Sequence, residues 1–122
     1  MRLLLDTHIL LWSVDADPKL TPRFRDAIET ADEVFVSAVS IWEIAIKTAL
    51  GKLVVAGDIA SRALDAGCRP LPVTWAHGRD AGRLPPPHHD PFDRLMIAQA
   101  RIERLTLVSA SRAFSLYDVL FL

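Results

Sequence analysis

Three acidic side chains stand out because each lies among apolar residues. Asp6 directly follows the run Leu3–Leu5, Glu43 lies within Ile41–Ile46, and Asp93 stands near the start of a long amphipathic segment. If the three carboxylates converge they repel, by about 4 kcal/mol for two charges ~4 Å apart at an effective dielectric near 20. A divalent cation relieves this repulsion, and oxygen-only ligands favour Mg²⁺ or Mn²⁺ over zinc. Convergence therefore predicts a magnesium site.

Each acid also has a purely structural interpretation. Asp6 and Asp90 suit the N-cap position of a helix, and the acid three residues after Asp90 suits a first helical turn. Ser40 and Glu43 have the spacing of a capping box. Lys47, four residues after Glu43, can form an ordinary helical ion pair with it. The functional interpretation depends on whether the acids converge.

The apolar patterning predicts strands that alternate with helices. Helices are expected from about Ile9, after Thr21-Pro22, and over Ser37–Leu50, Ile59–Ala66, Thr74–Leu84 and Pro91–Arg104. Strands are expected at Leu3–Leu5, Val34–Val36, Leu71–Val73, Leu105–Ser109 and Val119–Leu122. This alternation indicates an α/β protein with a parallel sheet covered by helices on both faces. Ligands bind beyond the carboxyl ends of such strands, which is where Asp6 lies.

The composition predicts one globular domain over residues 1–122, with 51% apolar and 24% charged residues. The net charge of −1 argues against tight, non-specific binding of nucleic acid, although acids masked by a metal still permit a local site. No apolar run is long enough to span a membrane, and Asp6 interrupts the only run that resembles a signal peptide. With a single cysteine, Cys68, the chain is expected in the cytoplasm.

Several segments resemble a known family in the right order along nearly the whole chain. Leu4–His8, Ser37–Ile44 and His89–Ala100 resemble the first three motifs of PIN-domain nucleases, in particular the VapC toxins of bacterial toxin–antitoxin pairs. Leu107–Ser109 and Phe114 resemble the last segment of that family. The third motif is the most specific of these.

The resemblance implies a three-layer α/β/α fold, metal-dependent cleavage of RNA and inhibition by a partner antitoxin. Asp6, Glu43 and Asp93 match the acidic positions of the family, and Asp90 is a candidate auxiliary acid. Asp6 and Asp93 are expected to hold Mg²⁺, for which Mn²⁺ can substitute. Glu43 is expected to hold the metal through water or to accept a proton from the attacking water.

The chain departs from the family at one position and leaves two others open. The family often carries a further acid two residues after the position of Ser109, where this chain has Ser111. Serine brings no charge, so a second metal is not predicted. Arg94 and Arg112 are candidate phosphate contacts, and the alternative is that both are solvated surface charges.

The segment around Glu43 also predicts a homodimer. Trp42, Ile46 and Ala49 lie on one side of the expected helix, and other apolar residues lie on other sides. One helix cannot easily face two cores, so part of this surface is expected to meet another chain. The alternative is a helix that is buried all round.

Parts of the sequence also fit three other functions. Asp6-Thr7-His8 fits the D-x-H of metallophosphoesterases, but those enzymes need an asparagine ligand and this chain contains none. His88-His89 suggests zinc, but no second ligand cluster with zinc spacing exists. A degenerate nuclease that only binds RNA or a partner protein remains as the alternative, because of Ser111.

Overall fold

The computed structural model describes residues 1–85, 90–111, 114 and 122. The strands are β1 (Arg2–Leu5), β2 (Glu33–Ser37), β3 (Arg69–Leu71) and β4 (Thr106–Val108), all parallel, in the order β3-β2-β1-β4. The helices are α1 (Thr7–Val14), α2 (Pro22–Thr30), α3 (Ala38–Ala49), α4 (Ile59–Asp65), α5 (Trp75–Arg83) and α6 (Pro91–Glu103). The predicted α/β class, with a parallel sheet and helices alternating with strands, is confirmed.

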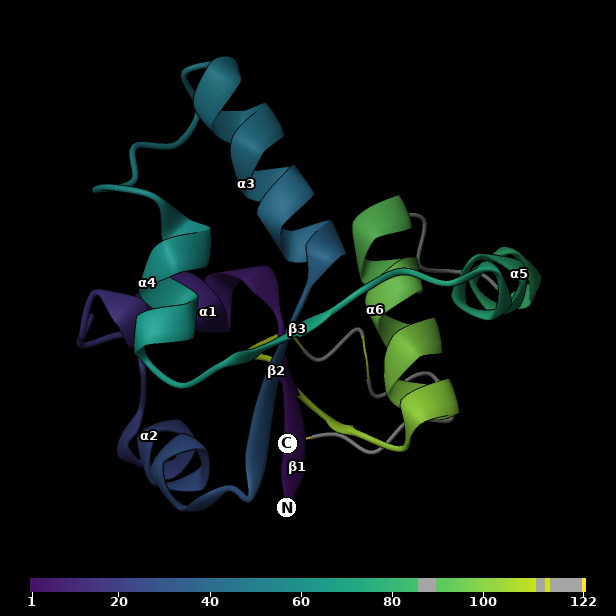
Figure 1. Cartoon of the computed structure of the whole chain (residues 1–122), viewed down its shortest axis with the longest axis horizontal. Coiled ribbons are helices and arrows are strands. Elements are labelled where there is room, and N and C mark those ends of the chain that lie inside the picture. The colour runs from purple at the N-terminus through teal and green to yellow at the C-terminus, as the bar shows by residue number, and fades with distance from the viewer. Residues whose placement is uncertain (86–89, 112–113, 115–121) are drawn as a thin grey trace.

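The sheet separates two hydrophobic cores, because successive side chains of β1 point to opposite faces. Leu3 and Leu5 pack with residues of α1, α3 and α4, whereas Leu4 packs with Met96 and Ile97 of α6. All three leucines are completely buried, as expected for a central strand of a parallel sheet. In Figure 1, α1, α2 and α4 lie on one side of the sheet and α5 and α6 on the other. This is the predicted three-layer α/β/α arrangement.

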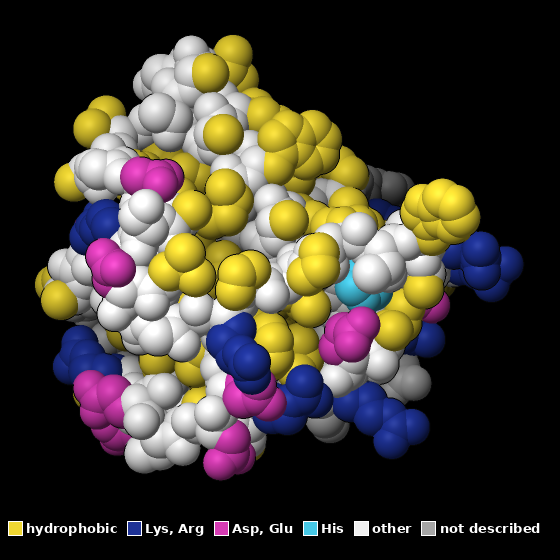
Figure 2. Space-filling model, viewed as in Figure 1, with side chains coloured by type: hydrophobic (Ala, Val, Ile, Leu, Met, Phe, Trp, Pro, Cys, Tyr) yellow, Lys and Arg dark blue, Asp and Glu magenta, His cyan; other side chains and the backbone are white. Residues whose placement is uncertain are grey.

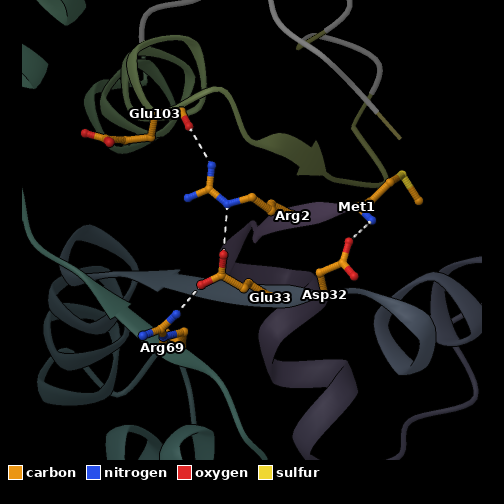
Figure 3. A network of polar contacts seen from close by, with 6 residues as sticks. All are labelled: Met1, Arg2, Asp32, Glu33, Arg69 and Glu103. Carbon is orange, nitrogen blue, oxygen red and sulfur yellow. Dashed lines mark hydrogen bonds and ion pairs between the residues drawn. The ribbon is translucent and has the colours of Figure 1, made fainter.

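Ion pairs join the amino-terminal ends of three strands, at the end of the sheet opposite to Asp6. Glu33 at the start of β2 accepts from Arg2 at the start of β1 and from Arg69 at the start of β3 (Figure 3). Arg2 also donates to the backbone carbonyl of Glu103, where α6 ends. These contacts therefore tie the amino-terminal ends of β1, β2 and β3 to one another and to the end of α6.

Strand β3 lies two residues earlier than predicted, over Arg69–Leu71 rather than Leu71–Val73. It is an edge strand that pairs with β2, and an edge position tolerates Pro70, which has no N–H to donate. The carbonyl of Pro72 accepts a hydrogen bond from the side chain of Gln99 on α6, which directs the chain away from the sheet.

Two further expectations concern the chain ends and the membrane. The strand predicted at Val119–Leu122 lies outside the described residues except for Leu122, which exchanges backbone hydrogen bonds with Leu107 and Ser109. None of the helices in the described part of the chain has the length and apolar composition that a membrane crossing requires.

Candidate active site

Asp6 lies at the carboxyl end of β1, where the chain turns into α1. Its Oδ1 accepts a 2.8 Å hydrogen bond from the backbone N–H of Ile9, which makes Asp6 the N-cap of α1. Its Oδ2 accepts a hydrogen bond from the hydroxyl of Ser109, just beyond β4. The side chain is buried. The predicted N-cap is confirmed, and the same contacts fix the carboxylate at the edge of the sheet.

Burial raises the pKa of Asp6 and is the largest influence on it. The hydrogen bonds from Ser109 and Ile9 lower this pKa, and the nearby negative charge of Glu43 raises it. The charged form of Asp6 is therefore disfavoured in the fold, and a cation bound beside it would stabilise that form.

Glu43 comes from the middle of α3, whose bounds agree with the helix predicted over Ser37–Leu50. The N-cap of α3 is Ser37, whose hydroxyl accepts from the N–H of Val39 at 3.0 Å. The capping box of Ser40 with Glu43 is therefore wrong, because the helix begins three residues earlier than that pattern requires. Glu43 is only 5% exposed, so its carboxylate needs partners within the protein.

Both carboxylate oxygens of Glu43 have such partners. The hydroxyl of Thr7 donates to Oε1 at 2.6 Å and also lies 3.1 Å from the hydroxyl of Ser40. The ammonium group of Lys47 donates to Oε2 at 2.9 Å, which confirms the predicted ion pair. Because Thr7 directly follows Asp6, its bond to Glu43 brings the first two acids together across α1 and α3.

Asp90 and Asp93 lie at the start of α6, as predicted. Asp90 is the N-cap and accepts from the backbone N–H groups of Phe92 and Asp93 at 2.9 and 3.2 Å. Helix α6 packs against α3, where the ring of Phe92 meets that of Trp42 edge-on at 5.3 Å. The charges of both aspartates help to raise the pKa of Lys47, so the start of α6 lies within electrostatic reach of the Glu43–Lys47 pair.

Serine residues follow β4 at the same edge of the sheet. Ser109 is buried and donates to Asp6, and its own oxygen accepts from the backbone N–H of Ser111 at 3.0 Å. Ser111 is exposed. The sequence interpretation did not assign Thr7 or Ser109 to the site. The sequence signal that could have found them is a polar residue just after a buried apolar strand. Ser109 directly follows β4, and Thr7 comes two residues after the end of β1.

Of the two candidate phosphate contacts, Arg94 lies within the described residues and Arg112 does not. The guanidinium group of Arg94 donates to the backbone carbonyls of Ala81, Leu84 and Pro85, at and just beyond the end of α5. These bonds give Arg94 a role in joining α6 to α5, and a phosphate contact stays a prediction. Arg112 and the His88-His89 pair lie outside the described residues.

One cavity among the described residues lies away from the acids. It has a volume of about 440 Å³ and opens between α3, α4 and β3. Its lining is almost entirely apolar, with Ile41, Leu64 and Pro70 among the residues, and contains none of the four candidate acids. The acids instead lie where α1, α3 and α6 approach the carboxyl ends of β1 and β4.

The donor chemistry of the site fits a hard divalent cation. Asp6, Glu43 and Asp93 all offer carboxylate oxygens, the donors that such a cation prefers. Burial, and to a smaller extent the charge of Glu43, raises the pKa of Asp6, so a positive charge beside Asp6 would be stabilising. Residues 1–85, 90–111, 114 and 122 nevertheless hold no group of three or more His, Cys, Asp or Glu side chains close enough to bind one metal ion together. Lys47 is the cation that contacts Glu43 in this arrangement.

The family of the chain follows from a family model for the PIN domain, which matches residues 3–120. The chain therefore belongs to the PIN domain family. No curated protein sequence matches the chain.

Several solved structures share this fold, among them a toxin–antitoxin complex from Klebsiella pneumoniae that is 15% identical with a TM-score of 0.59, over 89% of this chain and 86% of that one. VapBC2 from Rickettsia felis, bound to a DNA fragment from its promoter, is 16% identical with a TM-score of 0.70, over 100% of this chain and 98% of that one. VapC20 from Mycobacterium tuberculosis, a toxin that cleaves the Sarcin-Ricin loop, is 16% identical with a TM-score of 0.70, over 97% and 96%. FitAcB from Neisseria gonorrhoeae is 19% identical with a TM-score of 0.64, over 98% and 95%.

Proposed function

We propose that residues 1–122 form a single nuclease domain that cleaves RNA in a metal-dependent reaction, as the cytoplasmic toxin of a toxin–antitoxin pair. One observation carries this proposal. Asp6 and Glu43, from separate elements, are both buried at the carboxyl ends of the parallel strands and interact electrostatically. Two neighbouring buried carboxylates destabilise a fold unless a positive charge compensates them. Such pairs are typical of functional sites, and the oxygen donors of these two suit a bound cation.

In this proposal each residue of the site has its own role. Asp6 and Asp93 would hold Mg²⁺ or Mn²⁺, which when bound polarises the scissile phosphate and makes a water molecule easier to deprotonate. Ser109 and the N–H of Ile9 hold the Asp6 carboxylate in one orientation. Thr7 donates to Oε1 of Glu43, a carboxylate that would hold the metal through water or accept the proton of the attacking water. Asp90 begins α6 and so sets the position of Asp93.

The proposed partners are an antitoxin protein, an RNA substrate and a second copy of the chain. One similar structure is a toxin–antitoxin complex, which supports an antitoxin here. Another is a toxin that cleaves the Sarcin-Ricin loop, which supports an RNA substrate. Trp42 is 59% exposed and Leu50 63%, so α3 is not buried all round. Figure 2 shows hydrophobic side chains gathered over α3 and the middle of this face, which supports a protein partner there.

A domain that binds RNA or a partner without cleaving it is the alternative function. Two observations favour it: the serine at position 111, and the lack of three closely grouped metal-binding side chains among the described residues. The two functions differ in whether a purified protein cleaves RNA when Mg²⁺ is added, so one substitution at the site separates them.

The test is Asp93→Asn, with Asp65→Asn as the matched control on the exposed end of α4. Asparagine keeps the shape of the side chain and removes the charge that would hold the metal. Proteins free of antitoxin are compared for RNA cleavage in Mg²⁺ and in chelator. We expect Asp93→Asn to lose at least about 100-fold in rate, since even indirect partners of metal ligands contribute 10–100-fold. We expect Asp65→Asn to match wild type. Cleavage by Asp93→Asn at the wild-type rate would remove Asp93 from the site.

A further inference from the structure

Lys47 is a half-exposed residue whose positive charge contacts a buried acid of the site. Its ammonium group lies 2.9 Å from Oε2 of Glu43, and the side chain of that glutamate is only 7% exposed. Thr7 holds the other oxygen of Glu43 at 2.6 Å. Each oxygen of this catalytic candidate is therefore already engaged, one by a hydroxyl and the other by a full positive charge.

More than one acid acts on Lys47. The hydrogen bond and the charge of Glu43 raise the pKa of Lys47, and the charges of Asp90 and Asp93 on α6 raise it further. Helices α3 and α6 pack together, so the ammonium group lies within electrostatic reach of acids from both. Lys47 therefore balances part of the charge of several acids of the site, and not that of Glu43 alone.

We propose that Lys47 is the resident cation of the acid site, and that it competes with the divalent metal for the carboxylate of Glu43. The proposal rests on the metal site of the proposed function and adds a residue that opposes its occupation. The side chain of Lys47 is 40% exposed, so the ammonium group can turn towards solvent and release Glu43.

Removing the charge of Lys47 should have two opposite effects. Without metal, the carboxylates of Glu43, Asp90 and Asp93 lose a compensating charge, so the protein should melt at a lower temperature. With metal, the cation no longer competes with an ammonium group, so it should bind more tightly. A monovalent and a divalent cation about 6 Å apart in water repel by about 1.4 kcal/mol, which corresponds to about tenfold in affinity.

The experiment is calorimetric titration of Mg²⁺, and separately Mn²⁺, into purified protein without RNA at fixed pH and ionic strength. Wild type is compared with Lys47→Met, Lys47→Arg and the control Lys52→Met, which removes an exposed lysine beyond the end of the same helix. We expect Lys47→Met to bind Mg²⁺ about tenfold more tightly and to melt lower in chelator. Lys47→Arg keeps the charge, so it and the control should behave as wild type. Lys47→Gln, which keeps a donor but no charge, replaces Lys47→Met if that variant fails to fold.

The possible failures are distinguishable. Equal or weaker Mg²⁺ binding by Lys47→Met overturns the competition while leaving the metal site intact. A similar gain in affinity in Lys52→Met would also overturn it, because the effect would then be one of net charge. If no variant binds Mg²⁺ or Mn²⁺ at millimolar concentrations, both this proposal and the metal dependence of the proposed function are wrong.

Discussion

Replacing Asp6 with asparagine should change the stability of the protein in opposite directions with and without Mg²⁺. The amide keeps an oxygen to accept the N–H of Ile9, and the hydroxyl of Ser109 can turn to accept from the amide nitrogen. Burial raises the pKa of Asp6, so in the metal-free fold this group loses stability as the pH rises through that pKa. At neutral pH the full penalty is present. In chelator, Asp6→Asn should therefore melt higher than wild type.

The effect of Mg²⁺ should run the other way. At a free concentration about 100 times its dissociation constant, a ligand that binds only the folded state stabilises it by about 2.7 kcal/mol. A chain of 122 residues has an unfolding entropy of about 0.26 kcal/mol/K, so this gain raises the melting temperature by about 10 °C. Asp6→Asn lacks the charge that holds the metal and should show almost none of this rise.

The assay is thermal unfolding followed by circular dichroism, in chelator and over a titration of Mg²⁺. Asp26→Asn on the exposed surface of α2 is the matched control and should respond to Mg²⁺ as wild type does. If Asp6→Asn melts below wild type in chelator, Asp6 is a stabilising cap and its buried charge does not destabilise the fold. If the melting temperature of the variant still rises by about 10 °C in Mg²⁺, Asp6 does not hold the metal.

Two further predictions concern Ser109 and the surface of α3. Ser109→Ala removes a hydrogen bond that lowers the pKa of Asp6. The loss of stability with rising pH in chelator should therefore shift to higher pH in this variant. Superimposable curves of melting temperature against pH for the variant and wild type would contradict this. The chain should sediment as a dimer at micromolar concentrations. Trp42→Glu places a charge on the exposed side of α3 and should shift the protein towards monomer. A wild-type protein that sediments only as monomer would reject the dimer.

The sequence was sufficient to predict the layers of the fold because its apolar patterning is unambiguous. Leu3–Leu5 forms a buried central strand, and Pro91 with Asp90 begins a helix at the predicted residue. Two predictions failed for local reasons. The two prolines around Leu71 gave no indication of which side of them would pair with β2. The Ser40–Glu43 spacing imitated a helix start, whereas Ser37 caps the helix one turn earlier.

The acids could be predicted from the sequence because each stands out against apolar neighbours, but the groups that control them could not. Ser109 is 103 residues from Asp6, and Thr7 is 36 residues from Glu43, so only the order of strands in the sheet brings each pair together. The partnership of Lys47 with Glu43 was visible as a helical spacing, yet that spacing says nothing of burial or of the two aspartates on α6. What distinguishes a surface ion pair from a cation held within an acid site is thus tertiary packing, and the Mg²⁺ affinity of Lys47→Met measures that difference directly.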